Sequence, residues 1–202
     1  SQGLKSLATQ WGFAEESALK HGNKVSRNNW RVLMSWHIAE TRDQAREEAK
    51  EGLFKHNNEY STAALNPLEG KIFKTPDEAI DATAFSEDST AVIGTPDDLI
   101  QKIQEMLEIT GGFGAVIGFA HDWANRENTK KSWDLVARYV IPEINSMLDD
   151  YRDSYNFVIN NRDTWLRAKD ARFKNVEQHE SAAKVMETEG LEGEKAKTNQ
   201  KR

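Results

Sequence analysis

The spacing of apolar residues changes twice near the start of the chain. They first recur every three or four positions, which predicts one buried face of a helix, at Leu4, Leu7, Trp11, Ala14 and Ala18. Residues 30–39 are instead almost continuously apolar, which favours a strand buried on both faces. Thr41 and Gln44 then have the spacing of a helix cap. The helical period returns after them, at Ala45, Ala49, Leu53 and Tyr60.

Two more strands are predicted further along the chain. Residues 91–94 (AVIG) form a short apolar run, and residues 95–98 (TPDD) after it are typical of a helix start. An amphipathic helix follows and ends at the glycines 111–112, after which residues 115–119 (AVIGF) predict another buried strand. A long helix is predicted next, and Pro142 should kink or restart it.

Three strands that are each followed by a helix predict an α/β fold with a parallel sheet and right-handed crossovers. A closed (β/α)8 barrel has eight such units in about 250 residues, so three strands do not close one. Residues 61–90 lose the helical period, apart from a short capped helix at 75–78 (TPDE), as expected of a lid or a disordered insert. We expect charged helices over residues 151–189 and a disordered tail at 190–202.

Composition narrows the class of protein. The 202 residues include no cysteine, which excludes disulfide frameworks and thiolate sites, and six tryptophans, which help to fill a core. The net charge of −6 and the lack of a basic stripe argue against a nucleic-acid partner. No apolar run approaches the roughly 20 residues of a membrane helix, and the first residues show no signal peptide. We therefore expect a soluble, cytoplasmic protein with no membrane partner.

Candidate chemistry is expected where the strands end, because ligands of parallel α/β folds bind at the carboxyl ends of strands. The third strand leads into residues 119–125 (FAHDWAN). There His121 offers an acid or base near neutral pH, and Asp122 offers a carboxylate that could orient it. The structural alternative is that Asp122 or Asn125 caps the next helix while Trp123 packs on the rim.

The first strand contains a second group of candidates. His37 lies between apolar neighbours, which predicts a buried imidazole paired with a backbone carbonyl, or alternatively a hydrogen-bond donor that lines a pocket. Trp30, Trp36 and Trp123 are candidates for an aromatic ligand wall, and core packing explains at least one of them equally well. No two of the five histidines have metal-ligand spacing, so we expect no metal site.

Several segments resemble the bacterial luciferase-like flavin-dependent monooxygenases. They are residues 92–100 (VIGTPDDLI), 111–119 (GGFGAVIGF), 133–139 (WDLVARY) and 140–144 (VIPEI). Within that family, residues 29–41 (NWRVLMSWHIAET) and 118–125 (GFAHDWAN) are most similar to the limonene monooxygenase group. The resemblance covers about residues 9–160.

The resemblance implies that residues 1–150 are the C-terminal portion of a (β/α)8 TIM barrel, its last three strand–helix units, with residues 61–90 as a mobile lid. It implies a two-component enzyme: a separate flavin reductase supplies reduced FMN, and reaction with O2 gives a flavin hydroperoxide that oxygenates a small apolar, monoterpene-like substrate. A homodimer is the expected assembly. The N-terminal half of the barrel and the residues that bind the flavin phosphate have no counterpart in this chain.

Only residues at the strand ends are carried over from the resemblance. Those expected to line the substrate or flavin pocket are Trp36, His37, Phe119, Asp122 and Trp123. His121 is expected to form a hydrogen bond to the flavin or to the oxygenated intermediate. Two other interpretations stay open: a deazaflavin-dependent oxidoreductase of the same fold, and a non-catalytic flavin-binding or subunit-interaction module.

Overall fold

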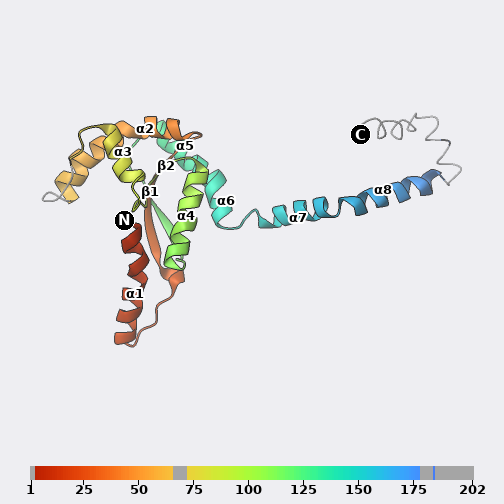
Figure 1. The fold of residues 1–202 in the computed structure, drawn as a ribbon, viewed down its shortest axis with the longest axis horizontal. Coiled ribbons are helices and arrows are strands. Elements are labelled where there is room, and N and C mark those ends of the chain that lie inside the picture. Colours follow the sequence, from red (N-terminus) through yellow and green to blue (C-terminus); the bar gives the residue numbers. More distant parts are fainter. Residues whose placement is uncertain (1–2, 66–71, 178–183, 185–202) are drawn as a thin grey trace. The chain divides into compact units, whose positions relative to one another are not determined.

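The computed structural model describes residues 3–65, 72–177 and 184 (Figure 1). The chain divides into two compact units, Ser1–Met147 and Leu148–Arg202. Within the described residues, the first unit holds the strands and the second holds helices alone. None of the helices in these ranges is both long enough and apolar enough to cross a membrane. The tail predicted to be disordered, residues 190–202, lies outside the described residues.

A parallel sheet forms the centre of the first unit. Its strands are β1 (Arg31–Ile38), β2 (Val92–Gly94) and β3 (Ala115–Phe119), at the positions that the apolar runs predict. The N-terminal part of β1 pairs with β3 and its C-terminal part pairs with β2, in the order β2-β1-β3. In a barrel wall the strands would follow chain order, with β2 in the middle. The parallel α/β sheet is therefore confirmed, while the partial barrel stays a proposal.

Successive side chains of a strand point to opposite faces of the sheet, and helices cover one face of β1. Met34 and Ile38 are buried on this face in the main hydrophobic core. The core is completed by apolar residues of α1 (Leu4–Lys20), α4 (Pro96–Thr110) and the π-helical turn η3 (Val136–Val140). The amphipathic faces read from the sequence thus meet on one side of the sheet.

A second apolar cluster joins α2 (Arg42–Lys55) and α3 (Pro76–Ala84) to the ends of β1 and β2. Small buried residues let the two helices approach closely. The buried residues that α2 and α3 contribute to this cluster are Ala45, Ala49, Leu53, Ala79 and Ile80. Tyr60, predicted on the same helical face, is 55% exposed. The helix continues beyond α2 as a π-helical segment, η2 (His56–Leu65), and this change of pitch rotates the face.

The helix ends follow the threonine and glycine signals in the sequence. Thr41, Thr75 and Thr95 each accept a hydrogen bond from the backbone N–H three residues further on, at 3.1, 3.2 and 3.4 Å. At Thr95 the box is reciprocal, since the Asp98 carboxylate accepts the Thr95 N–H at 2.9 Å. Gly111 ends α4 with a φ of +71°, a left-handed conformation that glycine adopts without strain.

Pro142 restarts the last helix of the first unit, as its missing N–H requires. α5 (Arg126–Leu135) leads through η3 into α6 (Ile141–Ile144), which has Pro142 in its first turn. The described part of the second unit, taken by itself, contains α7 (Asp149–Asn160) and α8 (Arg162–Glu177), in the region whose charge pattern predicts helices.

Candidate functional site

Three aromatic rings stack where β3 ends. The rings of Phe119 and His121 are 4.6 Å apart with an interplanar angle of 17°, and those of His121 and Trp123 are 4.7 Å apart at 5°. His56, from η2, meets the His121 ring edge-on at 4.8 Å. We refer to Phe119, His121 and Trp123 as the strand-exit stack. The strand end that the sequence singles out therefore carries an ordered set of rings.

β1 supplies a polar partner to this stack. Ser35 lies opposite Phe119 in the parallel ladder, and its Oγ is 2.8 Å from His121 Nε2. Leu33 lies opposite Ile117 on the same side, because residues two apart in a strand share a face. Ile117 and Phe119 are each 47% exposed. We call the surface formed by Leu33, Ser35, Ile117 and Phe119 the open sheet face.

Burial keeps the His121 ring neutral. Loss of water around the imidazole, together with the nearby His56, lowers the pKa of His121 to about 4, although Asp122 acts in the opposite direction. Burial also lowers the pKa of His56. At neutral pH His121 can therefore donate or accept a hydrogen bond, but it has no proton to give as an acid. Of the two roles predicted for His121, the geometry fits hydrogen bonding.

The two candidates on β1 lie in different places. Trp36 is on the helix-covered face, where its ring is 4.9 Å from that of Trp133 and leaves no room for a side chain at Gly118. The structure thus places Trp36 in the core and does not bring it to the stack. His37 is buried, and its Nε2 lies 2.9 Å from the Glu48 carboxylate of α2. A carboxylate takes the place of the expected backbone carbonyl.

The loop after β3 also starts a helix, as the structural alternative predicts. Asn125 caps α5, its Oδ1 accepting the N–H of Asn128 at 2.9 Å. Trp123 is 3% exposed and packs in the second apolar cluster. Asp122 lines a pocket instead of capping the helix. Packing and a role in the site are compatible for Trp123, because one face of its ring supports His121. Trp30, by contrast, contacts Trp11 at the opposite end of β1.

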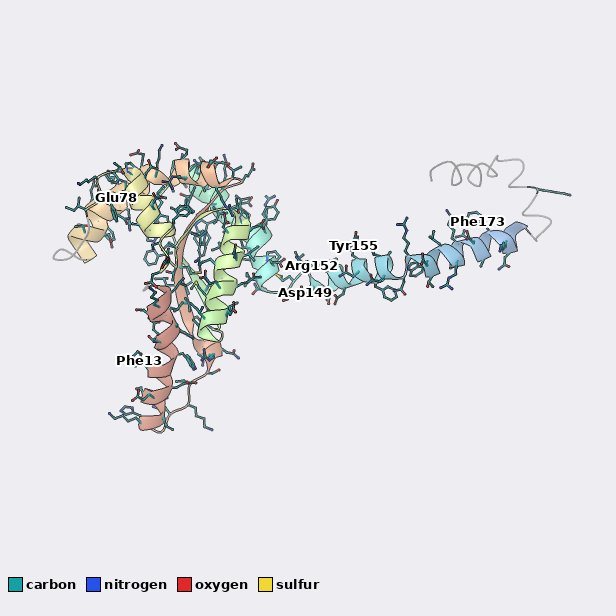
Figure 2. The ribbon with its side chains drawn as sticks, in the orientation of Figure 1. Phe13, Glu78, Asp149, Arg152, Tyr155 and Phe173 are labelled. Carbon is teal, nitrogen blue, oxygen red and sulfur yellow. The ribbon has the colours of Figure 1, made fainter. Side chains whose placement is uncertain are left out.

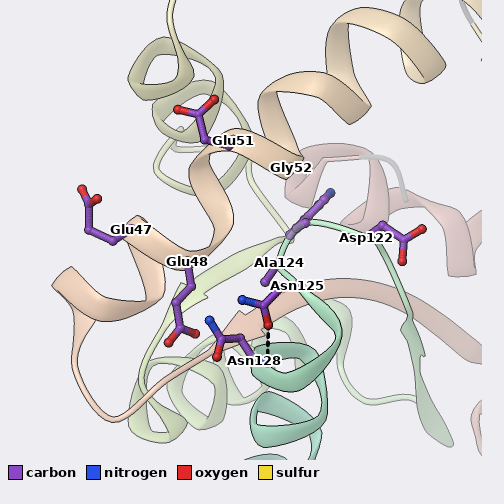
Figure 3. Close-up of a pocket in the computed structure, with 9 residues that line it drawn as sticks. Glu47, Glu48, Glu51, Gly52, Asp122, Ala124, Asn125 and Asn128 are labelled. Atoms are coloured by element: carbon purple, nitrogen blue, oxygen red, sulfur yellow. Dashed lines mark hydrogen bonds between the residues drawn. The ribbon is translucent and has the colours of Figure 1, made fainter.

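A pocket of about 460 Å³ lies between α2 and the loop after β3 (Figure 3). Its lining consists of Glu47, Glu48, Glu51, Gly52, Asp122, Trp123, Ala124, Asn125 and Asn128. Four carboxylates make the lining acidic, which suits neither a phosphate nor an apolar molecule. Within the described ranges, no cluster of histidines and carboxylates has the arrangement of a metal site. The strand-exit stack with the open sheet face is the better candidate site.

Two residues lie at this site that were not predicted from the sequence, His56 and Ser35. The polar neighbours of His56 in the sequence are typical of a solvated side chain, but the π-helical segment η2 brings this ring against His121. Ser35 is two residues before His37, so the alternation of β1 places both on the face away from the main core. That alternation was a usable signal for Ser35, whereas nothing in the sequence indicates the π-helix.

Sequence comparison finds relatives over most of the chain. It is 36% identical over 154 residues, 75% of its length, to 4-hydroxyprotoasukamycin monooxygenase of Streptomyces nodosus subsp. asukaensis. It is 31% identical over 158 residues, 78% of its length, to limonene 1,2-monooxygenase of Rhodococcus erythropolis. The homologues of this chain are luciferase-like monooxygenases. The chain spans 40% of the length of each of these two luciferase-like relatives.

Further comparisons give a weaker sequence match and a match of fold. A third luciferase-like relative, 3,6-diketocamphane 1,6-monooxygenase of Pseudomonas putida, is 26% identical over 148 residues. The solved oxygenating constituent of 3,6-diketocamphane monooxygenase from the CAM plasmid of Pseudomonas putida, a type II Baeyer–Villiger monooxygenase in complex with FMN, has a TM-score of 0.51 and 22% identity. That match covers 70% of this chain and 41% of the other, and it supports the α/β fold. No protein-family model matches the chain. The resemblance predicted from the sequence segments is confirmed.

Proposed function

We propose that this chain is part of a flavin-dependent monooxygenase that uses reduced FMN and O2 to oxygenate a small apolar substrate. The observation that carries the proposal is the strand-exit stack beside the open sheet face, in a chain whose homologues are luciferase-like monooxygenases. A planar isoalloxazine needs an apolar wall with a few placed hydrogen-bonding groups. Ile117 and Phe119 provide exposed apolar surface, and Ser35 and His121 provide the polar groups.

The described residues fit the ring of FMN better than its phosphate. Phosphate is commonly held by Arg or Lys side chains and by helix N-termini. Near the strand-exit stack, the lining of the adjoining pocket includes the acidic side chains of Asp122, Glu47 and Glu51. We therefore place the phosphate on the N-terminal half of the barrel that the resemblance implies. The flavin reductase, the lid at residues 61–90 and the homodimer belong to the same proposal.

In this proposal, FMN supplies the activation of O2 when it is bound and reduced. The chain's own task is to orient the ring and to limit the access of water. Stacking between Phe119 and Trp123 holds the imidazole of His121 in one plane. If Ser35 Oγ–H donates to Nε2 of the neutral ring, the proton of His121 is on Nδ1 and is free to be donated to the ligand.

His121→Ala in the complete enzyme tests this role. Loss of one hydrogen bond to the ligand is worth about 1.4 kcal/mol, so we expect product formed per reduced FMN to fall about tenfold. His21→Ala is the matched control, because that histidine is exposed and its ring contacts the Ser17 carbonyl of its own helix. An unchanged product yield in His121→Ala would remove the proposed role.

The choice of cofactor is tested by comparing reduced FMN with a reduced deazaflavin in turnover. Activity with FMN alone supports the monooxygenase, and activity with the deazaflavin alone supports the oxidoreductase. A non-catalytic module would bind flavin without consuming O2. Oxygen uptake measured with an electrode, alongside flavin binding measured by fluorescence, separates these outcomes.

A further inference from the structure

The described part of the second unit carries a row of large apolar side chains that are exposed, although Lys169 Nζ lies 5.7 Å from the Phe173 ring. Each is between 37% and 76% exposed; they are Tyr151, Tyr155, Val158, Ile159, Trp165, Leu166 and Phe173, which we call the apolar stripe. Steps of three, four and seven residues put them on one side of α7 and α8. Figure 2 labels Tyr155 and Phe173 on these two helices.

The backbone continues almost without a break along this stripe. Asn161 is the one residue between α7 and α8; its N–H donates to the Phe157 carbonyl, and the Trp165 N–H donates to the Asn161 carbonyl, both at 3.1 Å. Isolated helices are marginal in water and gain most of their stability by burying an apolar face. The stripe exposes on the order of 800 Å², about what one partner contributes to a standard protein interface. It therefore has the size of an interface.

The net charges of α7 and α8 are opposite in sign. On α7, three aspartates accompany one arginine; they are Asp149, Asp150, Asp153 and Arg152. On α8, five basic residues accompany three acidic ones; they are Arg162, Arg167, Lys169, Arg172, Lys174, Asp163, Asp170 and Glu177. The net charge is thus −2 on α7 and +2 on α8. Two copies side by side attract when antiparallel, and they repel when parallel because like charges are then opposed.

We propose that the apolar stripe is the surface through which two copies of this chain pair, with their α7–α8 segments antiparallel and centred near Arg162. α7 of each copy then lies against α8 of the other. This register puts Tyr151 opposite Phe173 of the partner subunit, and Val158 opposite Leu166 of the partner subunit. Both ends of the stripe are buried by the same contact, as a two-fold axis requires. The homodimer itself is part of the proposed function, whereas the pairing surface is tested by oligomeric state and not by activity.

The oligomeric state of the intact chain tests the stripe. Sedimentation equilibrium should show a dimer for the unchanged protein. Replacing Tyr155→Ser and Trp165→Ser together should raise the dimer Kd at least about 30-fold, as for loss of a central aromatic contact. Phe157→Ser is the matched control, because Phe157 is 60% exposed on the same helix but lies off the stripe. Its Kd should stay within about threefold.

Two results would overturn the proposal. One is a monomeric unchanged protein, which would mean that the stripe is covered by some other surface or by none. The other is a dimer that persists in the Tyr155→Ser, Trp165→Ser variant, which would place the contact elsewhere.

The chain lacks cysteine, so engineered single cysteines report the direction of pairing without background. Arg162→Cys stands at the centre and should form a disulfide between copies under mild oxidation. Lys169→Cys should not, because antiparallel pairing separates the two copies of that position by about 21 Å along the axis. Disulfides span Cα atoms about 4.4–6.8 Å apart. Dimers of Lys169→Cys on a non-reducing gel, or none of Arg162→Cys, would contradict the antiparallel arrangement.

Discussion

At the scale of single residues, the protonation of His121 is coupled to the stability of the first unit. Its pKa in the folded protein is about 4, whereas an unperturbed histidine titrates near 6.5. Between these values the unfolded chain binds the proton more tightly than the folded chain does. The contribution of the neutral ring to the free energy of unfolding is therefore complete above about pH 6.5, and it is lost as the pH falls towards 4.

This coupling predicts a pH-dependent urea midpoint. Going from pH 7 to pH 5 should lower the midpoint more in the unchanged protein than in His121→Asn, because the variant has no ring to protonate. Urea titrations followed by tryptophan fluorescence at both pH values measure the difference. His21→Asn, which changes an exposed ring, should keep the full pH dependence. Equal dependence in His121→Asn and the unchanged protein would disprove the coupling.

The sequence predicted the residues of the strand exit better than it predicted their partners. Phe119 ends the apolar run and His121 and Trp123 follow it closely, so the sequence places all three at one strand end. The approach of Ser35 and His56 depends on pairing and helix pitch between segments far apart in the chain. Local spacing carries no information about such contacts.

At the scale of elements, a glycine lets α2 rest directly on the loop after β3. A Cβ at Gly52 would overlap the backbone carbonyl of Trp123, whereas a Cβ at Gly12 in α1 would meet nothing within 4 Å. Both glycines lie inside helices, where alanine is intrinsically favoured by about 1 kcal/mol. The two positions therefore separate the effect of packing from that of helix propensity.

The corresponding substitutions should change stability in opposite directions. We expect Gly52→Ala to lower the free energy of unfolding by about 1–3 kcal/mol, because the methyl group must push α2 off the loop. Gly12→Ala should raise it by about 0.5–1 kcal/mol. Urea unfolding of both variants checks the signs. If Gly52→Ala left the free energy of unfolding unchanged or raised it, the loop after β3 would be able to move aside without loss of stability.

The positions at which helices begin and end were largely predictable from the sequence. The pitch of the π-helical segments and the order of the strands in the sheet were not. The threonine caps at positions 41, 75 and 95 act within four residues, so the sequence displays them directly. The π-helical segments η2 and η3 have hydrogen bonds from i to i+5 instead of i to i+4, and no residue type in the sequence marks where that change begins. The central position of β1 depends on the pairing of Arg31 with Ala115, a contact between distant segments.

At the scale of the whole molecule, the proposed function assigns the flavin ring to this chain and its phosphate to another part of the protein. The chain spans 40% of the length of the two relatives named first above. If the N-terminal half of the barrel binds the phosphate, as proposed, the flavin ring and its phosphate are bound by different parts of the protein. Binding by this chain alone should then be insensitive to the phosphate.

We therefore expect the 202-residue chain to bind riboflavin and FMN with dissociation constants within about threefold of each other. Quenching of flavin fluorescence measures both. Phe119→Ser should weaken both equally, because it removes part of the exposed apolar wall. FMN that bound more than about tenfold tighter than riboflavin would reveal a phosphate site on this chain and contradict the proposed placement.

The order β2-β1-β3 has a further consequence for local unfolding. Within the described sheet, β2 and β3 each pair with β1 and not with each other, so neither is held in place by the other. Val92 of β2 and Val116 of β3 pack in the same main core, whereas Ile93 of β2 packs with α3 in the second apolar cluster. β1 is the strand that holds both of its neighbours in the described sheet. Its backbone amides should exchange with solvent most slowly, since both neighbouring strands must separate before the whole strand is free.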